Sequence, residues 1–358
     1  MRVHHIINNY ALADGGAERL VRSLHLGLRK RGIESFILGL QKHSDDGLEY
    51  STSLGLRSPY GLKALNGIRR YIRDYIKEGD LIHAHLFPTN LYLSILKQLG
   101  MISVPNVATE HSTSNRRREY WAGSVIDTVV YRGFDKIFAI SEGVEQELLR
   151  WQPQLREKTV VVMNGSRLLF DQPLLRESSS PAIVLSVGIL CKQKNYKMAL
   201  SAFSLLKDYD VEYWIAGEGP DRKLLEQYAS VLGIGSKVKF LGYVEDIKPV
   251  LEQADLFLMP SLREGFGLAA VEAMNASLPV IASDISGLRE VVAAEPACAV
   301  LIDPLSPPTI ADALRALLDS RERRISMGRN GFTRSTLFDE DKMFESYLHQ
   351  YREVLKHA

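Results

Sequence analysis

The stretch LFLMPSLREGFGLAAVEAM, residues 256–274, joins an apolar run to a helical pattern through a loop that contains two glycines. LFLMPS predicts a buried strand, REGFG a loop at its carboxyl end, and the rest a helix that begins near Leu268. On one continuous helix, Glu264 and Glu272 would lie roughly 80° apart and two turns from each other. The glycines favour strand, loop and helix instead, and open α/β sheets bind ligands at this end of their strands.

Short apolar runs alternate with longer helical patterns along the whole chain, which is typical of repeated βα units. The expected strands are VHHII, SFILGL, DLIHAHL, SVPNVATEH, KIFAIS and TVVVMN in the first half, and AIVLSVG, EYWIAGEG, KVKFLGY, LFLMPS, PVIAS and CAVLID in the second. Two such sets in 358 residues predict two Rossmann-like domains, each with a doubly wound parallel sheet.

Composition predicts the domain boundaries. Residues 168–182 contain two prolines and a serine triplet, so we expect them to link a domain at 1–167 to a domain at 183–335. Residues 336–358 carry apolar side chains at three- and four-residue intervals and predict an amphipathic helix. These positions are Phe344, Tyr347, Leu348, Tyr351, Val354 and Leu355.

Charge and cysteine content narrow the class of protein. Residues 1–167 hold 23 Lys and Arg against 17 Asp and Glu, whereas the remainder holds 21 against 26, so the first half favours an anionic partner or an ordinary solvated surface. The only cysteines, Cys191 and Cys298, lack metal-like spacing and favour a reducing compartment. No signal peptide or membrane-spanning run is evident, so we expect a cytoplasmic protein whose membrane contact is at most peripheral.

The glycine loop suggests a ligand. Backbone N–H groups around Phe266, Gly267 and Leu268 would face an anion such as a phosphate at the start of the helix. A carboxylate beside a phosphate is repelled, so Glu264 and Glu272 would reach past it to hydroxyl groups. A nucleotide sugar offers hydroxyls on both sides of its diphosphate. The alternative is that both glutamates are solvated surface residues.

The segment SLREGFGLAAVEAMNASLPVIASDISGLREVV resembles the signature of glycosyltransferase family 4, retaining enzymes of the GT-B fold in which an E-x7-E element contacts the donor. The likeness continues through GGAER, TEHS, FAISEGVEQEL, VVMNGSR, VGILCKQKN, IAGEGPDRKLL and FLGYVEDI, over essentially the whole chain. It implies two domains that face each other across a cleft. The first would bind the acceptor and the second the donor, and the C-terminal helix would cross back to the first.

The resemblance implies roles for matching residues. Glu272 would hold the ribose and Glu264 the sugar hydroxyls, while Lys194 and the Phe266 loop would hold the diphosphate. His111 would lie beside the reacting sugar, although an isolated histidine is more often structural. We therefore expect Glu264, His111 and Lys194 to be the catalytic residues.

Further donor contacts are expected from two segments. Gly15 and Gly16 open a helix after the first strand and would allow backbone to approach an anion, with Asp14 as a helix cap, or they form a plain turn. Tyr243 and Val244, at the end of KFLGYV, would meet the base through backbone groups.

Lys192 joins Lys194 after the first strand of the second domain, where cations can neutralise a departing diphosphate or simply lie in solvent. The family pattern at this point is Val-Gly-Arg-Leu, and Ile189 replaces its arginine. Lys192 and Arg263 are the candidates for supplying the missing cation.

Two patterns suggest metal ligands. His83 and His85 alternate along LIHAHL and project to one face, but we find no third ligand near them and favour packing and cleft-lining roles. Asp339 and Asp341 form D-x-D at the start of the terminal helix, where acidic residues favourably meet the helix dipole. We expect no divalent ion and no cofactor.

Two basic stretches suggest a lipid surface. Residues 60–80, YGLKALNGIRRYIRDYIKEGD, are amphipathic and basic, and NRRREYW places three arginines beside Tyr120 and Trp121. Both could contact anionic lipid or a lipid-diphosphate acceptor, although a helix packed on a sheet explains the first equally well. Its basic residues are Lys63, Arg69, Arg70, Arg73 and Lys77.

We therefore expect a retaining, metal-independent glycosyltransferase. It would transfer a hexose or N-acetylhexosamine from a nucleotide sugar, with a UDP-sugar favoured, to a glycan or lipid-linked acceptor in polysaccharide biosynthesis, without a nucleic-acid partner. The alternatives are a phosphorylase or sugar-nucleotide epimerase on the same architecture, and a non-catalytic two-domain sugar-binding protein.

Overall fold

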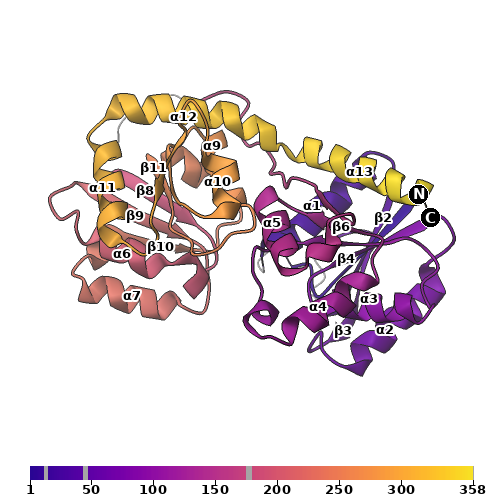
Figure 1. Ribbon diagram of the computed structural model, residues 1–358. Coiled ribbons are helices and arrows are strands. Elements are labelled where there is room, and N and C mark those ends of the chain that lie inside the picture. Colours follow the sequence, from indigo (N-terminus) through magenta and orange to yellow (C-terminus); the bar gives the residue numbers. More distant parts are fainter. Residues whose placement is uncertain (12–14, 43–46, 175–179, 358) are drawn as a thin grey trace. The chain divides into compact units, whose positions relative to one another are not determined.

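The structure of the protein, a computed structural model, describes residues 1–11, 15–42, 47–174 and 180–357 (Figure 1). The chain divides into two compact units, Met1–Asn164 with Glu340–Ala358, and Gly165–Asp339. The division therefore falls just before the expected linker at 168–182, whose described residues belong to the second unit.

The described part of the first unit contains a seven-stranded parallel sheet in the order β3-β2-β1-β4-β5-β6-β7. Its strands are β1 (Arg2–Ile7), β2 (Glu34–Gln41), β3 (Ser51–Leu56), β4 (Asp80–His85), β5 (Asn106–Glu110), β6 (Lys136–Ala139) and β7 (Thr159–Val161). The six runs expected in this half all form strands. The edge strand β3 was not predicted, because its serines, threonine and glycine give no apolar run.

Helices cover the sheet of the first unit. They are α1 (Gly16–Lys30), α2 (Leu62–Tyr75), α3 (Thr89–Gln98), α4 (Gly123–Arg132), α5 (Glu142–Trp151) and α13 (Glu340–Lys356), with 3₁₀ turns η1 (Arg116–Glu119) and η2 (Pro153–Leu155). The terminal helix α13 lies beside α1, where Gly27 leaves room for the ring of Phe344 and Ser23 donates to Glu340 at 2.6 Å (Figure 1). The buried face of α13 includes Tyr347 and Tyr351, as the periodicity predicts.

The described part of the second unit contains a six-stranded parallel sheet in the order β10-β9-β8-β11-β12-β13. All six strands were predicted. They are β8 (Ala182–Val187), β9 (Val211–Ala216), β10 (Val238–Gly242), β11 (Leu256–Met259), β12 (Val280–Ser283) and β13 (Ala299–Ile302). The helices are α6 (Tyr196–Phe203), α7 (Arg222–Val231), α8 (Lys248–Gln253), α9 (Leu268–Asn275), α10 (Ser286–Val292), α11 (Pro307–Leu318) and α12 (Arg321–Ser335), with 3₁₀ turns η3 (Lys192–Lys194), η4 (Gly235–Lys237) and η5 (Thr336–Phe338).

Strand order reverses once in each sheet, between β1 and β4 and between β8 and β11. At such a switch point the loops that follow the two central strands diverge to opposite faces and leave a crevice for a ligand. These loops carry the glycines after β1, the lysines after β8 and the glycine loop after β11, and the histidines of β4 lie at the end of that strand. Among the residues with described positions, no helix combines the length and apolarity needed to span a bilayer.

Candidate functional site

The glycine loop after β11 has the predicted form. The strand ends at Met259, the loop follows, and α9 begins at Leu268. Gly267 has φ +99° and ψ 52°, a left-handed conformation that residues with a side chain rarely adopt, and a Cβ there would lie 2.4 Å from Leu288 Cδ2. A Cβ on Gly287 would lie 2.0 Å from the carbonyl oxygen of Glu264, so this glycine, which the sequence did not single out, also holds the loop.

The structure brings Lys194 and Glu264 together. Lys194 Nζ lies 2.6 Å from Glu264 Oε1, and only 21% and 10% of the two side chains are exposed. The backbone around the pair is fixed, because Gln193 Nε2 donates to the Arg263 carbonyl at 2.9 Å and the Leu262 N–H donates to the Gln193 carbonyl at 2.8 Å. The two switch-point loops therefore present a cation and a carboxylate as one unit.

Asn195 supports this arrangement and was missed by the sequence reasoning. It adopts a left-handed conformation with φ 58° and ψ 30°, and its Nδ2 donates to the carbonyls of Pro260 and Pro304 at 3.0 and 2.7 Å. Asparagine tolerates this conformation better than most residues, and this tolerance is the only sequence feature that could have identified Asn195. Asn195 thus joins η3 to the loop that contains Glu264.

Glu272 lies on α9, whereas Glu264 lies in the loop that precedes this helix. Its side chain is partly buried and accepts a hydrogen bond from Ser166 Oγ at 3.4 Å. The ring of Phe266 is buried and meets Phe338 edge-on at 5.4 Å. Only the backbone of Phe266 is therefore available to a ligand, together with the N–H groups that the first turn of any helix leaves without intrahelical partners.

The other predicted donor contacts lie on the surface of the second unit. Lys192 and Arg263 are exposed near the Lys194–Glu264 pair, as is Ile189, at the position of the family arginine. Tyr243 is 47% exposed directly after β10, and Val244 is partly buried. Their roles in donor binding remain predictions.

In the first unit, α1 begins at Gly16, with Gly15 as an N-cap residue that offers no side-chain cap. The expected cap, Asp14, lies outside the described residues. Because Gly15 and Gly16 occupy the start of a 15-residue helix at the switch point, the N–H groups of this first turn face the end of the sheet where ligands bind.

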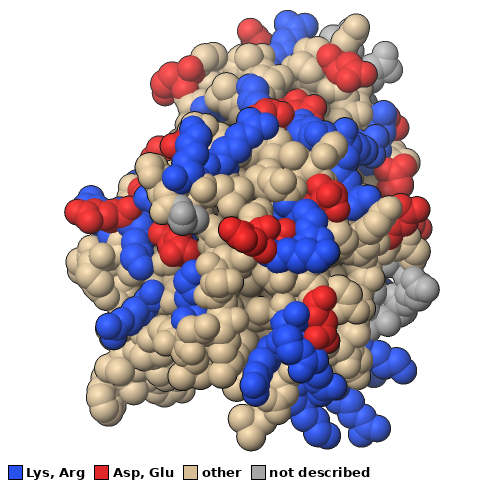
Figure 2. All heavy atoms as spheres, turned by 90° about the vertical axis from the view of Figure 1, so that its right-hand side faces the viewer, with Lys and Arg blue, Asp and Glu red and all other residues tan. Residues whose placement is uncertain are grey.

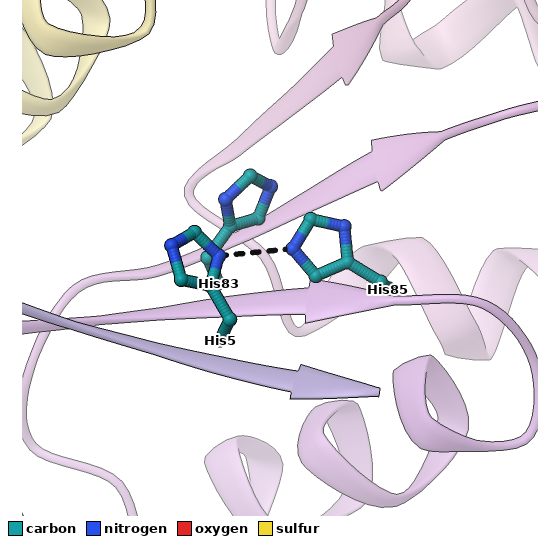
Figure 3. Close-up of side chains that lie close together, drawn as sticks. All are labelled: His5, His83 and His85. Atoms are coloured by element: carbon teal, nitrogen blue, oxygen red, sulfur yellow. Dashed lines mark hydrogen bonds between the residues drawn. The ribbon is translucent and has the colours of Figure 1, made fainter. Parts of the chain in front are cut away.

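A cluster of histidines lies on β1 and β4, the two strands at the switch point of the first unit, and at the end of β5. His5 Nδ1 lies 3.2 Å from His85 Nε2, as Figure 3 shows, and His85 Nδ1 lies 3.2 Å from Nε2 of His111, which directly follows β5. His83 stands beside His85 with ring centroids 4.0 Å apart. The expectation that no third histidine lies near His83 and His85 was therefore wrong, because β1 pairs with β4 in a register that sets His5 opposite His83.

Nitrogens of His5, His83 and His85 lie within 4.8 Å of one another and form a possible transition-metal donor set. Hydrogen bonds already engage most of them. His83 Nδ1 lies 2.7 Å from the Tyr351 hydroxyl and His83 Nε2 lies 2.6 Å from Thr109 Oγ1, so a metal bound to His83 would leave a buried hydroxyl without its partner.

Burial keeps these imidazoles neutral. Loss of hydration lowers the pKa of His5, His83 and His85 well below 6.5, and it lowers the pKa of His111 to about 3. The positive charges that neighbouring histidines would carry also lower the pKa of the first three. A neutral imidazole carries one N–H and one acceptor nitrogen, so the cluster works through hydrogen bonds at physiological pH.

Asp341 of the D-x-D pair, in the first turn of α13, has a structural partner. Asp341 accepts a hydrogen bond from Arg31 at 2.7 Å, and Glu345, one turn later on the same helix, accepts another at 3.0 Å. Asp341 thus ties α13 to the end of α1 and lies in the first turn of its own helix, where a carboxylate is favoured.

Comparisons with known proteins cover most of the chain. Residues 171–334 match the family described as Glycosyl transferases group 1, and residues 14–167 match Glycosyltransferase Family 4. The D-inositol 3-phosphate glycosyltransferase of Corynebacterium urealyticum is 34% identical over 326 residues, which cover 83% of this chain and 77% of that protein. An uncharacterized glycosyltransferase of Methanocaldococcus jannaschii is 26% identical over 338 residues, 91% of this chain and 92% of its own.

Solved structures share the fold at lower identity. The sucrose-phosphate synthase of Thermosynechococcus elongatus has a TM-score of 0.84 at 20% identity and covers 100% of both chains. The HepE protein of Anabaena, solved with UDP and glucose, has a TM-score of 0.83 at 18% identity and covers 99% of this chain and 100% of its own.

Proposed function

Because the chain belongs to the group 1 glycosyltransferases and has their GT-B fold, we propose that it is a retaining, metal-independent enzyme that transfers a hexose or N-acetylhexosamine from a nucleotide sugar. The acceptor we propose is a glycan or a lipid-linked glycan in polysaccharide biosynthesis. A UDP-sugar is the first donor to test, and the Anabaena neighbour, which was solved with UDP and glucose, supports this choice.

The Lys194–Glu264 pair carries this proposal. It combines a cation and a largely buried carboxylate, 2.6 Å apart, at the switch point of the second unit and beside the start of α9. A diphosphate leaving group needs positive charge, which Lys194 and the first turn of α9 would supply. Sugar hydroxyls need acceptors, which Glu264 would supply. A site that only captures a sugar has no use for a cation directed at a leaving group.

We propose a same-face displacement. The acceptor hydroxyl oxygen forms a bond to the anomeric carbon on the face from which the diphosphate departs, and the bond between that carbon and the phosphate oxygen breaks. The proton of the acceptor hydroxyl passes to the departing phosphate oxygen. In this scheme Glu264 positions the sugar and Glu272 holds the ribose, so neither carboxylate forms a covalent intermediate.

A surface of the first unit supports an acceptor carried on an anionic lipid. Lys63, Arg69 and Arg70 of α2 are exposed, and Lys and Arg side chains gather toward the lower end of the face in Figure 2, where Figure 1 places α2. Between α2 and β3 lies a groove of about 530 Å³, lined by apolar residues such as Leu54, by Lys63 and Arg70, and by one carboxylate, Asp74. Apolar walls with cationic groups suit a lipid phosphate.

The second basic stretch contributes less charge to this surface than its three arginines suggest. Arg117 is paired with the buried Asp127 at 2.6 Å, and Arg118 is largely buried near Glu110. Trp121, 89% exposed, remains available to an interface. We propose that the protein works in the cytoplasm and meets the membrane peripherally through α2.

Thermal denaturation with UDP, GDP, ADP and their sugars tests the donor, because a ligand that binds the native state raises its melting temperature. A second assay measures sugar transfer to a lipid-linked acceptor with and without EDTA, which removes divalent metal ions. We expect activity to survive EDTA and Glu264→Gln to lose at least about 100-fold in kcat, while Glu322→Gln, an exposed position on α12, has no effect. Full activity in Glu264→Gln would refute the assigned role.

Co-sedimentation with vesicles tests the lipid contact. Lys63→Glu combined with Arg70→Glu should abolish binding to vesicles rich in phosphatidylglycerol, and Lys223→Glu, an exposed lysine on α7, should not. Equal binding by both variants would exclude α2 as the contact.

A further inference from the structure

His111 lies at the end of a hydrogen-bonded row of imidazoles. The row runs from His5 through His85 to His111, with N···N distances of 3.2 Å at both steps. His83 flanks this row without joining it, because its own nitrogens lie within hydrogen-bonding distance of Tyr351 and Thr109. Figure 3 shows His5 and His85 joined in this way, with the ring of His83 beside them.

The row has only two possible arrangements of protons. Three neutral imidazoles carry one N–H each, and each of the two hydrogen bonds consumes one N–H. Either His5 donates from Nδ1, His85 donates from Nδ1, and His111 keeps an N–H on its outer Nδ1, or every donor is reversed and His111 presents a lone pair there. The protonation state at the His5 end therefore fixes the group that His111 offers at the other end.

The buried end of the row decides between these arrangements. Within the part of the chain that the structure describes, His5 Nε2 has no hydrogen-bond partner, and His5 is fully buried. In the first arrangement this atom is an unpaired acceptor, and in the second it is an unpaired N–H donor. Among backbone groups, buried N–H donors without acceptors are rarer than acceptors that lack a full set of partners, and we apply the same order to the imidazole of His5. The first arrangement is therefore favoured.

We propose that His5 and His85 are positioning residues that lock His111 in the tautomer with the proton on Nδ1, so that His111 acts as a hydrogen-bond donor. His85 donates from Nδ1 to His111 Nε2, and the Nδ1–H of His111 is left to donate to an oxygen. This inference rests on the proposed function for the identity of that oxygen, a hydroxyl or phosphate oxygen of a substrate. In this state His111 cannot accept the proton of the acceptor hydroxyl at Nδ1.

The tautomer can be measured without any substrate. Multiple-bond ¹H–¹⁵N spectra of protein labelled with ¹⁵N-histidine distinguish Nδ1–H from Nε2–H, and loss of one signal set in His111→Ala assigns the residue. We expect Nδ1–H in the native enzyme. An Nε2–H signal would overturn the proposal even if the protein proves to be an active transferase, so the two hypotheses fail separately.

Variants at position 85 test the connection. His85→Asn keeps an N–H near the place of Nδ1, so His111 should retain its Nδ1–H tautomer. His85→Leu removes this donor, so His111 should no longer be held in that tautomer. His83→Leu, an equally buried change on the same face of β4, is the matched control and should leave the tautomer unchanged. A shift in His83→Leu equal to that in His85→Leu would point to general loss of packing and refute the row.

Kinetics add a second readout. His85→Leu should lower kcat about 10- to 100-fold with little change in the KM of the donor, because an orienting partner acts on the reacting geometry more than on ground-state binding. His85→Asn should restore most of the lost rate. A loss confined to KM, or equal losses in the two variants, would contradict the proposal.

Discussion

Acidification should unfold the first unit long before the second, because every histidine of the chain lies in the first. The nine histidines occur at positions 4–111 and 349–357, and residues 165–339 contain none. Five of those in the first unit are at most 2% exposed. They are His4, His5, His25, His83 and His85.

The lowered pKa values of these histidines determine how the stability of the first unit changes with pH. Loss of hydration lowers the pKa of His4 and His25 to about 4 and that of the other three well below 6.5. Between pH 6.5 and 4 the unfolded chain therefore binds protons that the folded unit does not bind. The free energy of unfolding keeps its full value above pH 6.5 and falls as the pH drops below it.

The size of the effect is comparable to the whole stability of a domain. At pH 5.5 each buried histidine costs about 1 kcal/mol relative to pH 7.5, and five together cost about 5 to 7 kcal/mol if they act independently. Native domains are stable by only about 5 to 15 kcal/mol. The lowered pKa of Asp80, which Arg2 stabilises through a side-chain hydrogen bond, acts only below 3.8 and does not contribute in this range. We expect the first unit to unfold near pH 5.

Urea titrations at pH 7.5, 6.5 and 5.5 measure the free energy of unfolding of each unit. Trp214→Phe leaves only the tryptophans of the first unit, Trp121 and Trp151, and the complementary double variant leaves only Trp214. The second unit, which lacks histidine, is the internal control. A decrease in the first unit of less than about 2 kcal/mol between pH 7.5 and 5.5 would show that burial does not hold these imidazoles neutral.

Three further changes have definite expected costs in the second unit. Gly267→Ala forces a side chain into a left-handed conformation and against Leu288, so it should lower the free energy of unfolding by at least about 2 kcal/mol and weaken UDP binding, measured by denaturation and titration. Asn275→Ala removes the acceptor of two backbone N–H groups, so it should lower the free energy of unfolding in urea by about 3 kcal/mol. Unchanged stability would show that these hydrogen bonds do not anchor the segment. Lys194→Met should cost about 2 kcal/mol, and Glu264→Gln should recover much of it in the double variant; additive losses would show that the pair does not interact.

The strands of both sheets were predictable because most are buried. A strand with helices on both faces is a nearly continuous apolar run, which is visible in sequence. Within the described residues, the edge strand β3 pairs only with β2 and is half exposed, so its sequence STSLGL lacks that pattern. Its position became evident only from the sheet.

The site was predictable in its parts and not in its connections. Lys194 and Glu264 each follow a strand, and sequence placed both at the carboxyl end of a sheet. That they meet depends on β8 lying next to β11, which is a property of strand order. His5 was missed for the same reason, since VHHII reads only as a strand until the pairing of β1 with β4 sets it beside His83.

The eight-residue spacing of Glu264 and Glu272 owes its meaning to Gly267. The left-handed Gly267 precedes the first residue of α9, so Glu264 lies outside the helix that carries Glu272 and can meet Lys194. This arrangement assigns the two carboxylates to different environments. Glu264 is fixed in a loop beside its cation, while Glu272 lies on the helix near Ser166. The motif thus consists of two carboxylates in separate positions, one before the start of α9 and one within it. The eight-residue spacing includes the loop and the first turn of that helix.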